Sequence, residues 1–296
     1  MNQYEALVDD AVGKKHTVVL LGALDTGKTT FATSLLAAAV EAGRTSAYLD
    51  ADVGQKHVGP PATVSLKFVR SAEDLQADRM AVADSMSFVG AIAPEDHLLE
   101  VVAGVATLHR AAKEAGADFV VVDTSGLVSG IHGQILKYHK IELLQPDLVV
   151  GLQRGEEILP LLGVIQRFFR TEVVPLAVPP GVVPSTVDQR AENREEAMRR
   201  YFSGELHRFR VKPTVFMPAL PPWFDAAKLH RILVGLSDGA SSYPGLGYLE
   251  HAPEEGVLRL ITPVAAGPKA LRLGSVRLEE SFHARRVNLR DLFGSE

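Results

Sequence analysis

Gly22-Ala-Leu-Asp-Thr-Gly27-Lys28-Thr29 has the spacing of a phosphate-binding P-loop. It follows the apolar segment His16-Thr-Val-Val-Leu-Leu and precedes a helix-like stretch from Phe31 to Glu41. A glycine turn with a surface lysine is the alternative interpretation, but it does not account for this strand–loop–helix order. Backbone N–H groups and the helix N-terminus of such a loop converge on phosphate oxygens, Lys28 reaches the β- and γ-phosphates, and the Thr29 hydroxyl can ligate Mg²⁺. The predicted nucleoside triphosphate site comprises Gly22, Ala23, Leu24, Asp25, Thr26, Gly27, Lys28, Thr29 and Thr30.

Composition bounds the remaining possibilities. The chain has 296 residues, of which 46% are hydrophobic, enough for one large domain or a main domain with a smaller one. Its net charge of −5 argues against a surface coated in positive charge for wrapping DNA, although a local basic cleft is compatible with it. The absence of cysteine excludes disulfides, thiolate nucleophiles and cysteine-ligated zinc.

The N-terminal segment gives an expectation of location. Residues 1–15 contain Glu5, Asp9 and Asp10 and lack the apolar core of a signal peptide. No segment approaches the roughly 20 uninterrupted apolar residues of a membrane span. We therefore expect a soluble, cytoplasmic protein.

Apolar runs alternate with helical patterns through the first 205 residues. The expected strands are 17–21, 46–49, 87–90, 119–122, 148–152 and 173–178, and the expected helices between them are 29–42, 98–115, 133–144 and 158–169. Apolar strands separated by helices predict an α/β fold, a P-loop NTPase with a mostly parallel sheet covered by helices on both faces. Ligands of such sheets bind at the carboxyl ends of the strands, so the loops at Gly22, Asp50 and Asp123 are expected to meet at one site.

The composition changes after this region. Four prolines and Gly181 between Pro175 and Pro184 predict a stiff connector, and a charged helix is expected from Val187 to Phe202. Turn signals at 237–240, 243–247 and 253–256, expected strands at 258–261 and 271–278, and one expected helix at 224–233 follow. We expect a P-loop kinase domain at 1–205, with a lid at about 185–204, and a small β-rich C-terminal module at 206–296.

Asp50-Ala-Asp52-Val-Gly54-Gln55 follows the second expected strand. One of its two carboxylates can hold Mg²⁺ through water while the other accepts a proton from an attacking hydroxyl. The alternative is a pair of aspartates that only cap a turn. A position one βα unit after the P-loop favours the functional interpretation.

Asp123 ends the apolar strand Phe119-Val-Val-Val. This is the form of a Walker B segment, whose carboxylate holds the Mg²⁺ shell. The alternative is an aspartate that caps the next turn through Thr124 or Ser125. Asp52 and Asp123 compete for the metal role, and the sequence does not rank them.

The charged helix carries four arginines, at positions 190, 194, 199 and 200. Arg190 and Arg194 are four residues apart and share a face. Interleaved glutamates make a solvated, salt-bridged surface helix the plain interpretation. Phosphoryl transfer needs cations at the transferring group, however, and a mobile arginine lid hinged at the proline connector can supply them.

Together these segments resemble the polynucleotide 5′-hydroxyl kinase family, which includes the kinase subunit of the eukaryotic mRNA 3′-end cleavage factor and a kinase of pre-rRNA processing. The resemblance spans roughly residues 15 to 265 and suits a short prokaryotic form. It rests on the P-loop, on Asp50-Ala-Asp52-Val-Gly54-Gln55, on a Thr124-Ser125-Gly126 segment like the family's clasp, and on a lid-like arginine helix. Gly235-Leu-Ser-Asp238 and Gly245-Leu-Gly247 resemble its C-terminal β segment.

The resemblance implies transfer of the γ-phosphate of ATP or GTP to the 5′-OH of RNA or DNA, with Mg²⁺ as cofactor. It implies the following roles: Lys28, Asp52, Arg190 and Arg194 in catalysis, with Asp52 as general base; Thr29, Asp50 and Asp123 toward the metal; Gln55, Thr124, Ser125 and Gly126 toward the substrate end. Leu127 stands where the family often has a base-stacking Trp, and Ser185 where it often has a further lid arginine.

Other functions stay open on the sequence alone. A P-loop ATPase or GTPase that acts on protein partners, a scaffold that binds ATP without turnover, and a small-molecule kinase all fit a P-loop. These residues do not distinguish RNA from DNA as the substrate or ATP from GTP as the donor. They also do not reveal the oligomeric state, the pathway or any protein partners.

Overall fold

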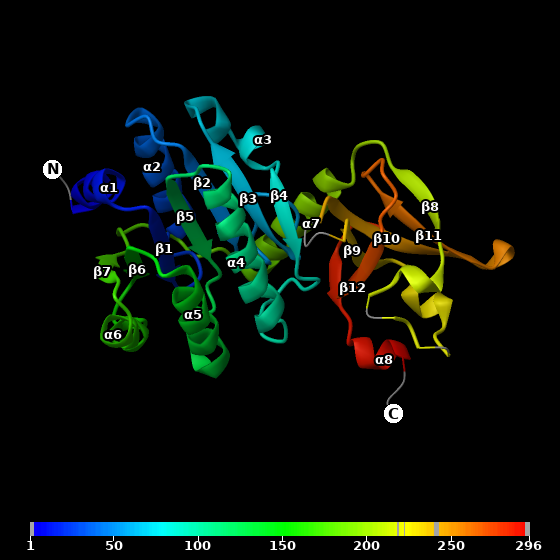
Figure 1. Ribbon diagram of the computed structural model, residues 1–296. Coiled ribbons are helices and arrows are strands. Elements are labelled where there is room, and N and C mark those ends of the chain that lie inside the picture. The colour runs from blue at the N-terminus through cyan, green and yellow to red at the C-terminus, as the bar shows by residue number, and fades with distance from the viewer. Residues whose placement is uncertain (1–2, 218, 222, 240–242, 294–296) are drawn as a thin grey trace.

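The computed structural model describes residues 3–217, 219–221, 223–239 and 243–293. Two β-sheets organise the chain and lie side by side, with helix α7 between them (Figure 1). The first sheet has seven strands in the order β4-β3-β2-β5-β1-β6-β7. Its strands are β1 (Thr17–Gly22), β2 (Ser46–Ala51), β3 (Thr63–Val69), β4 (Ser85–Phe88), β5 (Phe119–Thr124), β6 (Leu148–Gln153) and β7 (Glu172–Ala177).

Strands β2, β5, β1, β6 and β7 run parallel, whereas β3 and β4 are antiparallel additions at one edge. The predicted mostly parallel sheet is thereby confirmed. The register pairs Asp50 with Asp123 and Leu20 with Asp123. The carboxyl ends of β1, β2 and β5 therefore meet at one edge of the sheet.

Helices cover both faces of this sheet, as the sequence predicted. Apolar residues of α1 and α2 pack on one face, and those of α4, α5 and α6 on the other (Figure 1). These helices are α1 (Gln3–Lys14), α2 (Lys28–Glu41), α4 (Leu98–Glu114), α5 (Gly130–Leu144) and α6 (Leu159–Phe168); the short helices η1 (Ala72–Leu75) and α3 (Ala77–Met80) lie between β3 and β4.

Four elements of this region were not predicted: α1, β3, η1 and α3. β3 follows β2 through the irregular segment 52–62 rather than a helix, so the rule of alternating strands and helices does not find it. Pro175, expected in the connector, lies inside β7. β7 is the edge strand of the sheet, where a residue without an N–H is tolerated.

The second sheet is antiparallel, with the order β13-β12-β9-β10-β11-β8. It follows α7 (Val187–Tyr201), which begins at a capping box formed by Thr186 and Gln189. The strands are β8 (His207–Val211), β9 (Ile232–Ser237), β10 (Gly245–Ala252), β11 (Val257–Thr262), β12 (Ala270–Leu278) and β13 (Ala284–Arg286). Short helices η2 (Pro213–Val215), η3 (Ala226–Leu229), η4 (Pro253–Glu255) and α8 (Leu289–Phe293) complete it.

Two predictions for this region were wrong. The helix expected at 224–233 is only the short η3, because the chain turns at Arg231 with φ 58° and enters β9. The turn expected at 243–247 contains the start of β10. Its Gly247 allows close packing, since a Cβ there would meet Leu260 Cδ1 at 2.4 Å. The signal at 237–240 lies partly outside the described residues.

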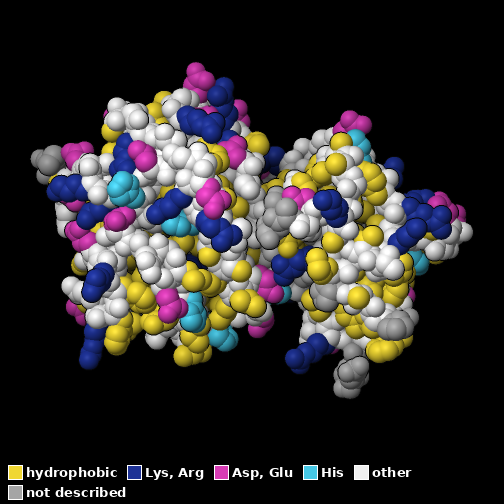
Figure 2. All heavy atoms as spheres, viewed as in Figure 1, with side chains coloured by type: hydrophobic (Ala, Val, Ile, Leu, Met, Phe, Trp, Pro, Cys, Tyr) yellow, Lys and Arg dark blue, Asp and Glu magenta, His cyan; other side chains and the backbone are white. Residues whose placement is uncertain are grey.

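An apolar cluster joins the two sheets through α7. Phe88 of β4 packs against Gly235 of β9 so closely that a Cβ on Gly235 would lie 2.3 Å from the Phe88 ring. Figure 2 shows a notch between the two lobes, and basic and acidic side chains intermixed over the visible face. The division into domains at residue 205, which falls between α7 and β8, stays a prediction. No helix in the described part of the chain has the length and apolarity to span a membrane.

Candidate active site

The P-loop joins β1 to α2 and forms a tight turn that contains Lys28. Gly27, directly before α2, has φ 84°, a left-handed conformation that glycine adopts without strain. Asp25 has φ 57°, a conformation with a higher conformational energy for a residue with a Cβ than for glycine. Lys28 Nζ donates to the Ala23 carbonyl at 2.6 Å, and burial lowers the pKa of Lys28 against the opposing effect of Asp123. The ammonium group therefore lies inside the turn that the motif predicted.

Arg154 supports this loop from the end of β6. Its guanidinium donates to the Leu24 carbonyl at 3.1 Å and to the Asp25 carbonyl. Arg154 was not predicted, because nothing in the sequence near it marks it as a neighbour of the P-loop. Its position directly after a central strand is the signal that could have identified it.

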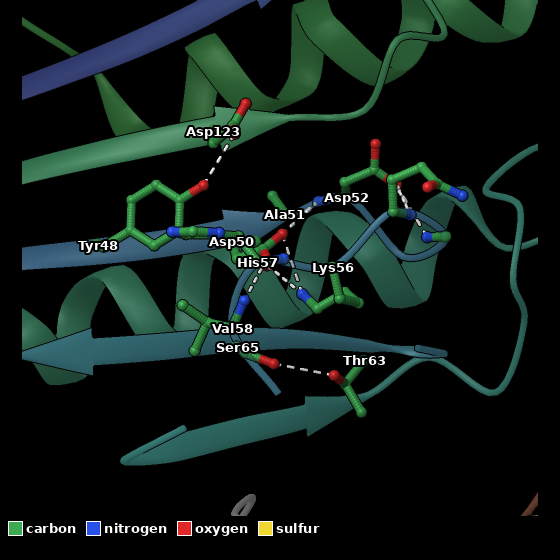
Figure 3. A network of polar contacts seen from close by, with 12 residues as sticks. Tyr48, Asp50, Ala51, Asp52, Lys56, His57, Val58, Thr63, Ser65 and Asp123 are labelled. Carbon is green, nitrogen blue, oxygen red and sulfur yellow. Dashed lines mark hydrogen bonds and ion pairs between the residues drawn. The ribbon is translucent and has the colours of Figure 1, made fainter. Parts of the chain in front are cut away.

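Asp123 lies beside the first turn of α2, as a Walker B carboxylate would. Its Oδ2 accepts from Thr29 Oγ1 at 2.6 Å. The same oxygen accepts from Tyr48 Oη at 2.8 Å (Figure 3). Its Oδ1 is buried and has no hydrogen-bond partner among the described residues. Burial raises the pKa of the Asp123 carboxyl, while Lys28 lowers it. An orphan carboxylate oxygen next to a threonine hydroxyl is a suitable donor set for a hard divalent cation.

The Asp50 carboxylate binds groups of the loop that follows β2. Its Oδ2 accepts from the N–H groups of His57 and Val58 at 2.8 and 2.9 Å, and its Oδ1 pairs with buried Lys56 at 3.0 Å and accepts from the Asp52 N–H (Figure 3). Both oxygens are thus engaged by the chain that follows β2. The contacts explain how the loop is held, and the expected role of Asp50 toward a metal stays a prediction.

Asp52 is held differently. Its Oδ1 accepts from the N–H groups of Gly54 and Gln55 at 2.8 and 3.0 Å, which fixes the carboxylate at the turn. Gly54 is needed here because a Cβ would lie 2.7 Å from the Ile92 carbonyl oxygen. The side chain of Gln55 donates to the Arg190 carbonyl at 3.1 Å, so this loop also contacts the lid helix.

The segment Thr124–Gly126 follows β5 and lies against the P-loop. A Cβ on Gly126 would meet Leu24 N at 2.7 Å, so only glycine permits this approach. Thr124 is fully buried and donates to the Leu20 carbonyl at 2.8 Å. Thr124 therefore braces the loop, while Ser125 and Gly126 line the neighbouring cleft.

Two buried lysines of α5 lie beneath these loops, and the sequence analysis did not single them out. Lys137 Nζ donates to Thr124 Oγ1 at 3.0 Å and to the Ser125 carbonyl at 2.6 Å. Lys140 Nζ lies 3.5 Å from the Ala51 carbonyl oxygen. Burial lowers the pKa of both, that of Lys140 to about 8. They support the Asp52 and Thr124 loops from inside the fold.

Helix α7, the predicted lid, is bound to the P-loop through its first turn and the residue before its cap. Ser185 donates to Asp25 through its N–H at 3.1 Å and through its Oγ at 3.2 Å, and Arg190 pairs with the same carboxylate at 3.4 Å. Ser185, which stands at the position of an expected lid arginine, thus binds the start of this helix to the P-loop. Arg194 faces the cleft, whereas Arg199 pairs with Glu195 and Glu196 on the helix surface.

Two cavities meet at Asp52. One, of about 280 Å³, is lined by the P-loop residues 24–30 together with Asp52, Gln55, Asp123, Thr124, Val182 and Val183. The other, also of about 280 Å³, is lined by Asp52, Gly54, Gln55, Ser125, Gly126, Leu127, Arg190, Arg194 and Arg286, among others. Leu24, Asp52 and Gln55 belong to both walls. A group in the first cavity and a group in the second therefore approach each other beside the Asp52 carboxylate.

A family model described as the P-loop of the mRNA cleavage and polyadenylation factor CLP1 matches residues 22–204. A polyribonucleotide 5′-hydroxyl-kinase of Pyrococcus horikoshii is 31% identical over an alignment that covers 90% of this chain and 87% of that protein. The polyribonucleotide 5′-hydroxyl-kinase Clp1 of Rattus norvegicus is 30% identical over 63% of this chain and 45% of its own length.

The same fold occurs in a solved structure of a wild-type Clp1p–Pcf11p complex. The TM-score is 0.73 at 14% identity, over 92% of this chain and 77% of that one. The chain therefore belongs to the CLP1 P-loop family, and the relatives named above as polyribonucleotide 5′-hydroxyl-kinases are phosphotransferases by name.

Proposed function

We propose that this chain is a polynucleotide 5′-hydroxyl kinase that transfers the γ-phosphate of ATP or GTP, with Mg²⁺, to the 5′-OH of RNA or DNA. One observation carries the proposal: Asp52 forms a wall common to the P-loop cavity and the arginine-lined cleft. A kinase needs the triphosphate and the acceptor hydroxyl in adjoining spaces with a base between them. The names of the archaeal relatives support the same reaction.

Asp52 is the proposed general base. As the 5′-oxygen bonds to the γ-phosphorus, the bond from that phosphorus to the β–γ bridging oxygen breaks, and the hydroxyl proton passes to the Asp52 carboxylate. Hydrogen bonds from Gly54 and Gln55 to Oδ1 fix the orientation of the carboxylate. A prepositioned base of this kind typically contributes about 10²- to 10⁴-fold to rate.

Cations of the P-loop cavity and of the adjoining cleft balance the charge that moves to the leaving diphosphate. Lys28 belongs to the P-loop, and Arg190 and Arg194 reach the cleft from the lid helix. Arginine donors at a transferring phosphoryl group stabilise the transition state because they are already oriented. We assign the phosphate clamp to these three residues.

Thr29 and Asp123 fit a Mg²⁺ ion. The fit rests on the buried, unpartnered Asp123 Oδ1 and on the Thr29 hydroxyl 2.6 Å from the other carboxylate oxygen. No cluster of three or more acidic, histidine or cysteine side chains that could hold a metal occurs among the described residues. This agrees with a preference of Mg²⁺ for one or two protein oxygens plus phosphates and water. Bound there, the ion neutralises phosphate charge.

The test is incubation with γ-labelled ATP or GTP and 5′-OH RNA and DNA oligomers, with 5′-phosphorylated oligomers as controls. We expect label on the 5′-OH oligomers only, dependent on Mg²⁺ and absent from the Lys28→Ala variant. Labelling of RNA but not DNA, or from one nucleotide only, fixes the finer specificity. Nucleotide hydrolysis that oligomers do not affect, or tight ATP binding without any turnover, would overturn the proposal in favour of an ATPase or a scaffold.

A further inference from the structure

A cavity of about 600 Å³ lies next to the cleft described above, and the roles assigned so far do not use it. Its walls are the segment 91–97, which follows β4, and the segment 286–290, which spans the end of β13 and the start of α8. The segments come from the two different sheets. Ile92, Ala93, Glu95 and Arg286 line both this cavity and the arginine-lined cleft, so the two spaces are continuous.

Ser275 of β12 fixes the walls of this cavity relative to each other. It donates through its N–H to the Gly90 carbonyl at 2.7 Å, accepts from the Val287 N–H at 2.9 Å through its carbonyl, and contacts His97 Nε2 at 2.9 Å through Oγ. A cavity braced from both sheets is largely preformed, and its volume is in the range of about 300–1,000 Å³ that holds small ligands.

The charge in this cavity is unequally distributed. Arg286 and Arg290 are exposed, and neither side chain has a hydrogen bond or ion pair within the described part of the chain. Across the cavity, the 91–97 wall carries Glu95 and Asp96. A chain of phosphates would therefore follow the arginine side, with its sugar or base edges toward the acidic side, where the buried Glu95 Oε2 has no partner among the described residues.

Arg286 also adds to the charge of the cleft itself. Arg194 has its pKa lowered by burial and by the nearby Arg190 and Arg286, and all three arginines line the cleft that Ser125 and Leu127 also line. A local concentration of cations in a protein of net charge −5 is an electrostatic site for an anion.

We propose that this cavity binds the polynucleotide behind its 5′ end, with Arg286 on a backbone phosphate at the mouth of the cleft and Arg290 on a phosphate further along. The inference rests on the proposed kinase function and deepens it. The C-terminal sheet is then part of the substrate site. Its contacts with phosphates beyond the 5′ end favour binding of an oligomer over a single nucleotide.

The experiment compares wild type, Arg286→Ala and Arg290→Ala on a 5′-OH dinucleotide and a 5′-OH decanucleotide. Arg285→Ala is the matched control, because neighbouring residues of a strand point to opposite faces and Arg285 lines none of the cavities described here. All three arginines are exposed, so the variants should fold.

We expect Arg286→Ala and Arg290→Ala to raise the KM for the decanucleotide about tenfold with little change in kcat, since a lost phosphate contact acts on binding. Arg290→Ala should leave the KM for the dinucleotide unchanged. The dependence of log KM on log salt should weaken by roughly 0.7 per arginine removed, the value for one single-strand phosphate contact.

The inference is overturned if both variants keep the wild-type KM for the decanucleotide, or if Arg285→Ala changes it equally. If wild type phosphorylates neither oligomer, the proposed function fails as well. If wild type phosphorylates both oligomers and neither arginine substitution changes the KM, this inference fails while the proposed function stands.

Discussion

The contacts between the predicted lid and the P-loop predict the rate at which a bound nucleotide dissociates. Ser185 and Arg190 both bind the Asp25 carboxylate, and Val182 and Val183 of the connector line the P-loop cavity. A nucleotide in that cavity therefore leaves after the connector and the start of α7 move away. We expect Asp25→Asn to accelerate this step.

The magnitude follows from the two interactions that the substitution removes. Asparagine keeps one acceptor oxygen and tolerates the left-handed backbone at φ 57°, so the substitution adds little strain. It removes one hydrogen bond, worth about 1 kcal/mol, and the Arg190 ion pair, worth up to about 1 kcal/mol at a side chain that is 24% exposed. A loss of about 2 kcal/mol corresponds to a roughly thirtyfold faster release.

The assay is stopped-flow displacement of a fluorescent ATP analogue by excess ATP. Asp188→Asn is the control, since it removes the same charge from an exposed position in the first turn of the same helix. If Asp25→Asn and Asp188→Asn release the analogue at the same rate, the contacts between the predicted lid and the P-loop do not gate the nucleotide and this reasoning is wrong.

Three further predictions concern stability. Tyr48→Phe removes a buried hydrogen bond to the Asp123 carboxylate and should lower the free energy of unfolding by about 1.5–3 kcal/mol in urea titrations; an unchanged midpoint would contradict it. Burial and Lys113 lower the pKa of His109 to about 4, below its ordinary 6.5. The neutral side chain therefore makes its full contribution to the free energy of unfolding above pH 6.5, and this contribution is lost as the pH falls toward 4. His109→Gln does not titrate, so wild type should lose up to about 3 kcal/mol relative to the variant between pH 7 and pH 4; parallel stability curves would refute this. Gly126→Ala should cost about 1–3 kcal/mol and weaken ATP binding because its Cβ meets Leu24, whereas Gly163→Ala, with open space around it in α6, should stabilise by up to about 1 kcal/mol; equal effects in thermal unfolding would argue against the close approach.

Local sequence patterns predicted the core of the fold well. The apolar strands and the helices between them reveal the parallel sheet, because burial on both faces requires continuous hydrophobic runs. β3 was not predicted, because it pairs antiparallel with β2 and no helix lies between the two strands. The helix expected at 224–233 failed because nothing in its composition reveals the left-handed turn at Arg231.

The site divides in the same way. The P-loop and Asp52 follow the ends of β1 and β2, and Asp123 lies near the end of β5, so one rule of sheet topology brings them together. Arg154, Lys137 and Arg286 reach the same region from elements far along the chain, and only the tertiary structure shows this. Asp50 and Asp52 look equivalent in the sequence, and the loop that follows distinguishes them, since its N–H groups and Lys56 engage both oxygens of Asp50.

Single-turnover transfer by Asp52→Asn tests the central claim most directly. The measurement follows label from prebound γ-labelled ATP to a 5′-OH oligomer, alongside the ATP dissociation constant of the same variant. We predict an ATP affinity within about twofold of wild type and a transfer rate lower by about 10²- to 10⁴-fold, because the carboxylate acts on the acceptor hydroxyl and not on the nucleotide. Transfer at the wild-type rate would contradict the assignment of Asp52 as the base between the two cavities.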